Sequence, residues 1–466
     1  MLGVALELRR RGYEVTFATN EHYAGLAARH GLPFEPLGTE ADFEACIRDP
    51  ALWQPRKALP HVFRCLQSSL RRQYEIHEAA AARGPTAGVT NVFGFGALLA
   101  REKLGVPVVT LHLQPAVLWS DHVPPSLPGM FGPRWLRSFL YSMAERFVVD
   151  PVFCPFLNAW REELGLAPVR QVMRWWHSPG GVLAMFPDWY AAAQPDWPEP
   201  LVQTDFPLWN DRADQRLDDE VEAFLQAGPP PVVFTPGSTN VHGGTFFDAA
   251  VYACRTLGRR GVLLTEFPEQ LPNDLPDGVT SFRYVPLDLL LDRSAAFVHH
   301  GGVGSTSQAL LAGIPQVLMP LAHDQFDNAE RVRRLGVGDS LPAPRFRGPR
   351  LVEKLQPLLE SPRVARRCQE IAKRLQARSG ISRTADGVEQ LVGAVRPVPA
   401  PGVDSSSGNI VTDDGKEECW NCGARSWCSD HFLPCTGNVM RVCPACLETL
   451  TKPSSPIPER TNRCEP

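Results

Sequence analysis

The stretch FVHHGGVGSTSQAL, residues 297–310, decides the fold class of this chain. Its apolar start predicts a buried strand, its glycines predict a tight turn, and a helix with hydroxyl residues in its first turn follows. A strand that passes through such a turn into a helix is typical of α/β proteins with a parallel sheet. The unpaired N–H groups and positive dipole end of this helix would suit a diphosphate.

Five residues of this stretch are candidate diphosphate ligands. Gly302 and Gly304 let the backbone approach a phosphate without an intervening Cβ. Ser305 and Thr306 can donate from their hydroxyls, and His300 can donate to an oxygen that gains charge as the diphosphate leaves. The spacing matches neither the dinucleotide pattern G-x-G-x-x-G nor the phosphate loop that ends in Gly-Lys-Ser/Thr. A turn that only packs a helix on a strand stays the alternative.

The run PLAHDQFDNA, residues 320–329, follows the next expected strand. It places a carboxylate and a carboxamide, Asp324 and Gln325, at the carboxyl end of that strand and beside the phosphate turn. Such groups bind sugar hydroxyls. The two runs together favour a site for a diphosphate that carries a sugar.

The rest of the chain alternates helices with short apolar strands, which predicts parallel sheets. Expected strands cover residues 14–18, 33–37, 87–92, 106–113, 231–235, 261–265, 280–284, 295–299 and 316–319. Expected helices cover residues 2–12, 23–30, 95–104, 245–257 and, as the last group, 351–395. Residues 114–230 are rich in Pro and Trp, and we expect loops and helices there, over an apolar cleft.

Length and composition restrict the class of protein. A chain of 466 residues suggests two or three domains. A formal charge of -4 gives no global basic surface for nucleic acid. No apolar stretch is long enough for a transmembrane segment, and the first 11 residues do not resemble a signal peptide. We therefore expect a cytoplasmic protein.

The twelve cysteines fall into two groups. Five are scattered, and we expect buried free thiols there: Cys46, Cys65, Cys154, Cys254 and Cys368. The other seven lie in the last 48 residues, where two Cys-x-x-Cys knuckles predict a structural zinc site. The predicted zinc ligands are Cys419, Cys422, Cys443 and Cys446. We expect this tail to offer a surface to a protein partner or to be an unrelated extension.

Residues 300–325 resemble the C-terminal signature of family 1 glycosyltransferases with the two-domain GT-B fold. The bacterial branch that acts on sterols, macrolides and other natural products is most similar. The resemblance implies two Rossmann-like domains that face a cleft. It implies the following boundaries: 1–212 for acceptor binding, 213–396 for the nucleotide-sugar donor, 397–414 as a flexible linker and 415–466 as the cysteine-rich tail.

The resemblance also assigns residues to parts of the donor. Gly237 and Ser238 would form the first loop of the donor domain, at the diphosphate. Val285 and Leu287 would lie against the nucleotide base, and Gln308 would face the ribose. The five residues of the glycine-rich stretch match diphosphate contacts, and the Asp-Gln pair matches sugar contacts.

The implied reaction is displacement at the anomeric carbon of a UDP- or TDP-hexose, with inversion and without a catalytic metal. The acceptor would be a lipophilic small molecule that loses a hydroxyl proton to a general base. In the family this base precedes the helix that corresponds to residues 2–11, so the resemblance places it before Met1. Asn91 stands where some relatives have an Asp that orients the base. His112, His22 and His122 are other histidines of the first half, and none is assigned as the base.

Two alternatives remain open at the level of sequence. The chain could bind a nucleotide sugar without transferring it, because the base is not assigned. It could also act as an interaction protein through its zinc-binding tail, with a degenerate enzyme domain.

Overall fold

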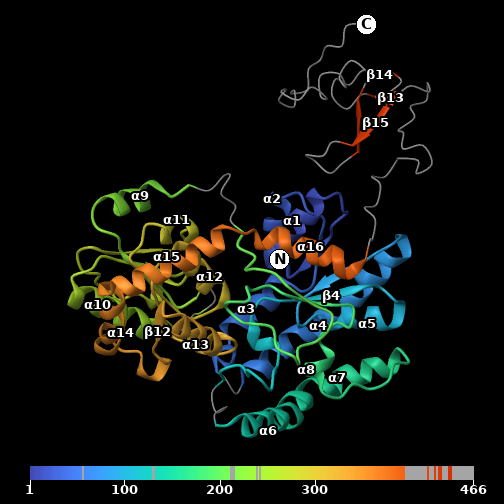
Figure 1. Cartoon of the computed structure of the whole chain (residues 1–466), viewed down its shortest axis with the longest axis horizontal. Coiled ribbons are helices and arrows are strands. Elements are labelled where there is room, and N and C mark those ends of the chain that lie inside the picture. The colour runs from blue at the N-terminus through green and yellow to red at the C-terminus, as the bar shows by residue number, and fades with distance from the viewer. Residues whose placement is uncertain are drawn as a thin grey trace.

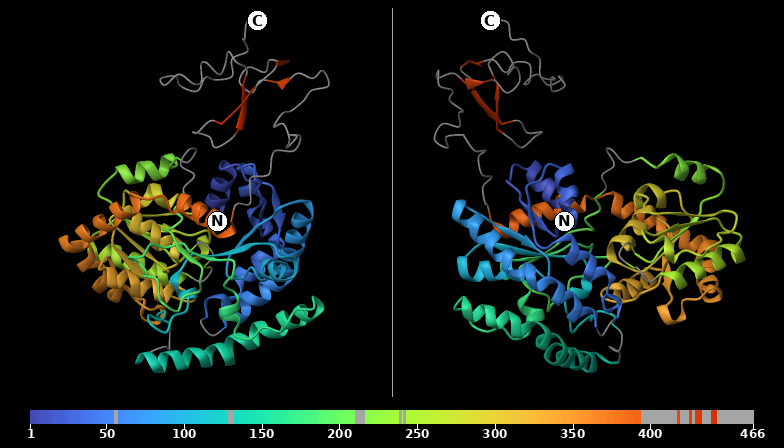
Figure 2. Two further views of the ribbon diagram at one scale, coloured as in Figure 1. Left: turned by 45° about the vertical axis from the view of Figure 1, so that its right-hand side comes forward. Right: turned by 180° about the vertical axis from the view of Figure 1, so that it is seen from behind.

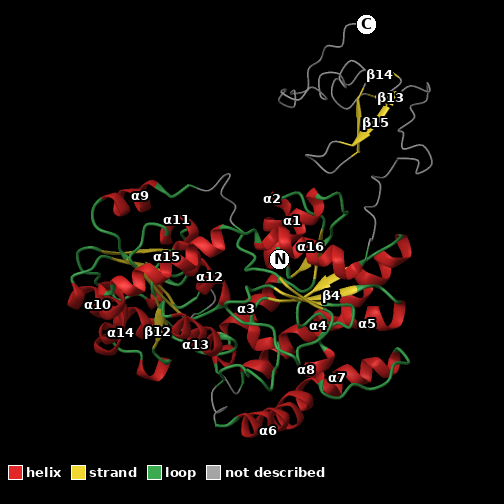
Figure 3. Cartoon of the chain, in the orientation of Figure 1, coloured by secondary structure: helices red, strands yellow, loops and turns green. Residues whose placement is uncertain are grey.

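The computed structural model describes residues 1–54, 57–127, 132–209, 216–237, 240, 243–393 and four short strands of the tail. Each half of the molecule contains parallel strands that are flanked by helices (Figures 1 and 3). Among the described residues, no helix combines the length and the apolar character that crossing a bilayer requires.

The sheet of the second half has six parallel strands in the order β12-β11-β10-β7-β8-β9. Their bounds are β7 Val232–Thr235, β8 Gly261–Leu264, β9 Val279–Phe282, β10 Ala296–His299, β11 Gln316–Leu318 and β12 Gly338–Ser340. The first strand, β7, lies beside the fourth, β10, and the chain builds outward from this pair in both directions. This order is that of a doubly wound sheet, and its topological switch point lies between β7 and β10.

Helices cover both faces of this sheet, so neighbouring side chains of one strand enter different cores. Phe234 of β7 packs in a cluster with Phe247, whereas the adjacent Val233 packs with Phe297 on the other face. The helices are α9 Asp219–Gln226, α10 Gly244–Leu257, α11 Leu287–Leu291, α12 Val303–Ala312, α13 Gln325–Leu335, α14 Gly348–Glu360 and α15 Pro362–Gln376. Burial on both faces explains why the sequence shows continuous apolar runs here.

The first half contains two separate sheets. Strands β1 Phe17–Thr19 and β2 Phe34–Pro36 pair with each other, and four strands form a parallel sheet in the order β3-β4-β5-β6. The four are β3 Gly88–Thr90, β4 Val108–His112, β5 Val182–Ala184 and β6 Leu201–Gln203. The prediction of loops and helices for residues 114–230 is wrong at β5 and β6. Both have only three residues, too few for a pattern to emerge among the surrounding prolines and tryptophans.

The helices of the first half include two that the sequence interpretation missed, at residues 40–48 and 58–83. All of them are α1 Leu2–Arg10, α2 Ala24–Arg29, α3 Glu40–Arg48, α4 Ala58–Arg83, α5 Phe95–Leu104, α6 Arg134–Ala144, α7 Asp150–Glu163 and α8 Val172–Trp175. The longer of the two missed helices, α4, has 26 residues and packs along α5. A π-helical turn, Glu145–Val149, joins α6 to α7, and the three form an edge of the molecule (Figure 2).

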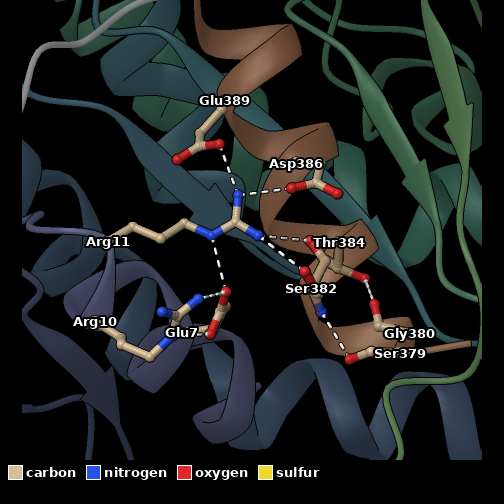
Figure 4. Close-up of polar contacts among 9 residues, drawn as sticks. All are labelled: Glu7, Arg10, Arg11, Ser379, Gly380, Ser382, Thr384, Asp386 and Glu389. Atoms are coloured by element: carbon tan, nitrogen blue, oxygen red, sulfur yellow. Dashed lines mark hydrogen bonds and ion pairs between the residues drawn. The ribbon is translucent and has the colours of Figure 1, made fainter. Parts of the chain in front are cut away.

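The last described helix of the main body, α16 Gly380–Val392, returns to the first half and packs on α1, β4 and β5. Arg11 fixes this contact, because its guanidinium reaches both Asp386 and Glu389 at 2.7 Å and also Glu7 at 2.9 Å (Figure 4). The range 213–396 expected for the donor domain therefore ends in a helix that packs on the other domain.

The cysteines divide as the sequence suggested, with one difference. The five scattered ones are free thiols, but only Cys254 and Cys368 are buried, while Cys46, Cys65 and Cys154 are half-buried. In the tail, strands Glu417–Glu418 and Arg425–Ser426 pair antiparallel, as do Ser429–Phe432 and Val439–Val442. The predicted zinc ligands Cys419, Cys422, Cys443 and Cys446 lie outside the described residues, so the zinc site stays a prediction.

Candidate active site

The glycine-rich turn after β10 meets the loop after β7 at the switch point of the second sheet. A Cβ on Gly237 would lie 3.1 Å from the ring of His300, and one on Gly302 would lie 2.6 Å from its Nε2. Gly237 and Gly301 also have φ values of +104° and +93°, which favour glycine. The His300 ring is therefore held between two backbone segments, each of which approaches too closely for a side chain. Ser238, the other predicted residue of the first loop, lies outside the described residues.

His299 supports the turn from inside the sheet. Its ring is buried, Nδ1 accepts from the N–H of Gly301 at 3.0 Å, and Nε2 lies 3.0 Å from Oε1 of Gln316. Because Nδ1 accepts, Nε2 carries the hydrogen and donates to Gln316. Burial lowers the pKa of His299 to about 3, and His300 adds to this shift. This neutral imidazole is a structural part of the turn.

His300 is also neutral at physiological pH. Burial, and secondarily His323, lower its pKa to about 4. A neutral imidazole can donate one hydrogen bond without bringing a fixed positive charge.

Helix α12 begins directly after this turn. Gly302 is its N-cap and has no side chain to cap the helix, while Asp324 accepts from the N–H of Val303 in the first turn. A Cβ on Gly304 would meet nothing within 4 Å, so the first turn borders open space. Ser305 is partly exposed, whereas Thr306 is fully buried and its hydroxyl has no hydrogen-bond partner within the described part of the chain. A helix N-terminus beside open space offers backbone N–H donors to an anion.

Asp324 and Gln325 stand at the N-terminus of α13, after β11. The Gln325 Oε1 accepts from the backbone N–H groups of Leu321 at 2.7 Å and Ala322 at 3.1 Å, so its loop is fixed through the carboxamide oxygen. Burial raises the pKa of Asp324 to about 6, against the opposing effect of hydrogen bonds that include the N–H of Val303 in α12. The carboxylate thus reaches the first turn of α12, and the two predicted parts of the site adjoin.

Asn328 joins these parts, and sequence interpretation missed it. Its Nδ2 donates to the Gly301 carbonyl at 2.9 Å and to Asp324 Oδ2 at 2.6 Å, and its Oδ1 accepts from Tyr190 OH at 2.9 Å. Asn328 is fully buried. Its position four residues after Asp324, on the same helix face, was the available signal.

The first domain contacts this side of the site directly. The backbone N–H of Ser126 donates to Asp327 at 2.9 Å, and His323 Nε2 lies 3.1 Å from the carbonyl of Leu52. Arg331 donates to the Tyr190 carbonyl at 3.0 Å. The loop that carries Asp324 is therefore held from both domains.

Comparison with known proteins agrees with this geometry. Residues 262–391 match the family model of the erythromycin biosynthesis protein CIII-like C-terminal domain. The chain is 32% identical over 357 residues to glycosyltransferase GtfC of Amycolatopsis orientalis, covering 74% of this chain and 83% of that one. It is 29% identical over 353 residues to the vancomycin aglycone glucosyltransferase of the same organism, covering 72% and 81% of the two chains. The chain belongs to the family 1 GT-B glycosyltransferases that act on natural products.

A solved structure supports the fold. Glycosyltransferase VinC in complex with dTDP aligns with a TM-score of 0.59 at 21% identity, covering 84% of this chain and 95% of VinC. The two-domain GT-B fold expected for this glycosyltransferase is therefore confirmed.

The residues predicted for the nucleoside have different surroundings in this glycosyltransferase. Val285 is buried in a core cluster with Leu290 and Phe297, so its side chain serves packing. Leu287 begins α11, which packs on α12. Gln308 is partly exposed on α12. These assignments stay predictions.

The histidines of the first domain do not supply an evident base. His112, which we considered for the cleft, is buried and its Nε2 lies 2.9 Å from Nδ1 of His177. Burial, together with His177, lowers the pKa of His112 well below its ordinary value. His22 stacks on Phe43 at 4.1 Å between ring centres and pairs with Glu40 at 2.8 Å.

His122 and Asn91, the other two residues considered in relation to the general base, lie in loops. His122 borders a cavity of about 340 Å³ that is lined by residues 122–127, Arg137 and Arg334. Asn91 is exposed, and its Oδ1 accepts from the N–H of Phe93 at 2.9 Å, which is a local turn contact. The base of this glycosyltransferase is not assigned among these residues.

Proposed function

We propose that this glycosyltransferase moves a hexosyl group from a UDP- or TDP-sugar to a hydroxyl of a lipophilic small molecule, with inversion and without a catalytic metal. The observation that carries this proposal is the meeting of Gly237, His300 and the glycine-capped N-terminus of α12 at the switch point of the second sheet. Ligands of doubly wound proteins bind in that crevice.

In the proposed reaction, the diphosphate lies at the N-terminus of α12 and accepts from backbone N–H groups of its first turn. The acceptor oxygen forms a bond to the anomeric carbon while the bond from that carbon to the diphosphate oxygen breaks. The nucleoside diphosphate leaves with the electron pair, and the acceptor proton passes to a base. The neutral His300 donates to the leaving oxygen as its charge grows, in a site where burial strengthens such a bond.

The sugar would be held by the loop before α13. Asp324, once ionised, accepts from sugar hydroxyls, and Gln325 has its Nε2 left to donate because its oxygen already binds two backbone N–H groups. Asn328 keeps this loop at a fixed distance from the phosphate turn. We propose that the acceptor lies against residues 114–200, and a relative that acts on the vancomycin aglycone is consistent with a large natural-product acceptor.

The test is transfer by the full chain from UDP-glucose and TDP-glucose to a panel of lipophilic aglycones, followed by mass spectrometry. Product NMR identifies the anomeric configuration, and inversion requires the β-glucoside. We expect His300→Ala to reduce kcat about 100-fold. His22→Ala, an exposed histidine paired with Glu40, is the control and should retain activity. Protection by TDP against thermal unfolding without any transfer would instead favour the alternative of a binding protein. If TDP gives no protection and no transfer occurs, the proposed donor site is refuted.

A further inference from the structure

Three potential metal ligands meet in the first domain, away from the donor site. Cys46 lies in the last turn of α3, and His61 and Cys65 lie one turn apart on α4. One ligand atom from each residue lies within 4.8 Å of the other two. Cys65 Sγ lies 3.6 Å from His61 Nε2. Helix spacing of i and i+4 places the two α4 residues on one face, directed toward α3.

These distances match a tetrahedral metal site. Zinc binds sulfur at about 2.3 Å and imidazole nitrogen at about 2.0–2.1 Å. With a tetrahedral angle between them, the sulfur and nitrogen would be about 3.6 Å apart. That is the separation found between Cys65 and His61.

Asp49 supplies an independent indication. Its Oδ2 lies 3.3 Å from Nδ1 of His61, the ring nitrogen that faces away from Cys65. Metal-binding histidines commonly donate their second ring N–H to a carboxylate, which fixes the tautomer and leaves the other nitrogen for the metal. His61 is buried, so this orientation is held.

We propose that Cys46, His61 and Cys65 bind a divalent thiophilic metal ion, zinc being the one that this ligand set favours, with water at the fourth position. Binding forms two metal–sulfur bonds and one metal–nitrogen bond. Both thiol protons pass to solvent, and the His61 hydrogen moves from Nε2, which donates to the Cys46 carbonyl, to Nδ1, toward Asp49. The contact of 2.9 Å between His61 Nε2 and the Cys46 carbonyl is replaced by the metal bond.

The location gives this site a consequence for the enzyme. The ligands join the end of α3 to the start of α4 and so close the segment between them. That segment contains the 3-10 turn Pro50–Trp53, whose Leu52 carbonyl lies 3.1 Å from His323 in the donor loop. A metal here would fix the surface on which the donor loop rests.

The first experiment needs no variant. The full chain is loaded with zinc or treated with a chelator, then alkylated with N-ethylmaleimide, and each cysteine peptide is quantified by mass spectrometry. Zinc should slow the modification of Cys46 and Cys65 at least tenfold. Cys154 is equally half-buried but belongs to no such group of ligands among the described residues, so it should react at the same rate in both samples. Because each cysteine is followed separately, zinc bound in the tail does not confuse the result.

The second experiment counts metal per chain by elemental mass spectrometry. Cys46→Ser/Cys65→Ser and His61→Gln should each contain one zinc fewer than the parent, whereas Cys154→Ser should contain the same amount. A Cys419→Ser/Cys422→Ser variant measures the tail separately. Equal alkylation rates with and without zinc would overturn the proposal. So would a disulfide between Cys46 and Cys65 in protein prepared with zinc and without an oxidant.

Discussion

Replacing Asn328 by Ala should damage both stability and donor binding, because this one side chain holds three separate elements together. The change removes a hydrogen bond to the Asp324 carboxylate and two neutral ones, to the Gly301 carbonyl and from Tyr190 OH. A hydrogen bond to a charged group contributes about 1.5–3 kcal/mol and a neutral one about 0.5–1.5 kcal/mol. The loss of all three therefore predicts a decrease of about 2.5–6 kcal/mol in the free energy of unfolding.

The effect on the donor has a separate cause. Without Asn328, the loop that carries Asp324 is no longer tied to the Gly301 turn, and the hydrogen bond that opposes the rise of the Asp324 pKa is lost. More of the carboxyl group is then protonated at neutral pH and cannot accept from the sugar. We expect the Kd for a nucleotide sugar to rise about tenfold, and the Kd for the free nucleoside diphosphate to rise less.

The assays are urea denaturation and isothermal titration with TDP and TDP-glucose, both below the unfolding temperature of the variant. Asn158→Ala is the matched control, because this asparagine also holds the chain through its side chain, with both hydrogen bonds to the backbone of Val169. The control should lose about 1–2 kcal/mol and keep its donor affinity. If folded Asn328→Ala binds TDP-glucose as tightly as the parent, the proposed role of the loop is refuted.

Three further predictions concern single groups. The kcat/KM for the donor should rise with pH through about 6 and then level, because the Asp324 pKa is about 6 and only the ionised carboxylate accepts from the sugar. Asp324→Asn should remove this step from the pH profile. Because the pKa is raised in the folded protein, the contribution of Asp324 to the free energy of unfolding should fall as pH rises from about 3.8 to 6. Gly302→Ala should displace the His300 ring and weaken TDP binding in calorimetric titration. Gly304→Ala adds a methyl group with no atom within 4 Å, so it should leave the melting temperature unchanged. Arg11→Ala should lower the free energy of unfolding in urea by about 2 kcal/mol by releasing α16 from α1. Arg10→Ala, at an exposed position, should leave the urea midpoint unchanged, and equal effects of the two substitutions would contradict this.

Much of the second sheet could be predicted from sequence, because its signals are local. The turn after β10 carries its own glycines, and each buried strand forms one apolar run between turn residues. The helix predicted at residues 95–104 is α5 itself, since a left-handed Gly105 ends it. For the same reason Asp324 and Gln325 could be assigned to the end of the next strand.

Contacts between distant segments could not be predicted. The return of α16 depends on Arg11 meeting Asp386 and Glu389, and no local pattern encodes that pairing. Cys46 and Cys65 stand 19 residues apart, a spacing unlike that of zinc knuckles, and only the packing of α3 against α4 brings them together. A place on the strand predicted for residues 106–113 makes a position toward the cleft plausible for His112, yet the structure places its ring against a second buried histidine, His177.

The donor site combines groups that local sequence predicts with groups that only contacts between distant segments bring to it. The groups that would touch the diphosphate and the sugar come from two short runs in the second domain, each with a recognisable sequence. The groups that fix those runs come from the first domain: Tyr190 through Asn328, the Leu52 carbonyl through His323, and Ser126 through Asp327. Because a hydrogen bond across a domain interface constrains both partners, the first domain helps to fix the position of the loop that carries Asp324. Donor affinity in this glycosyltransferase should therefore depend on residues that no donor motif includes.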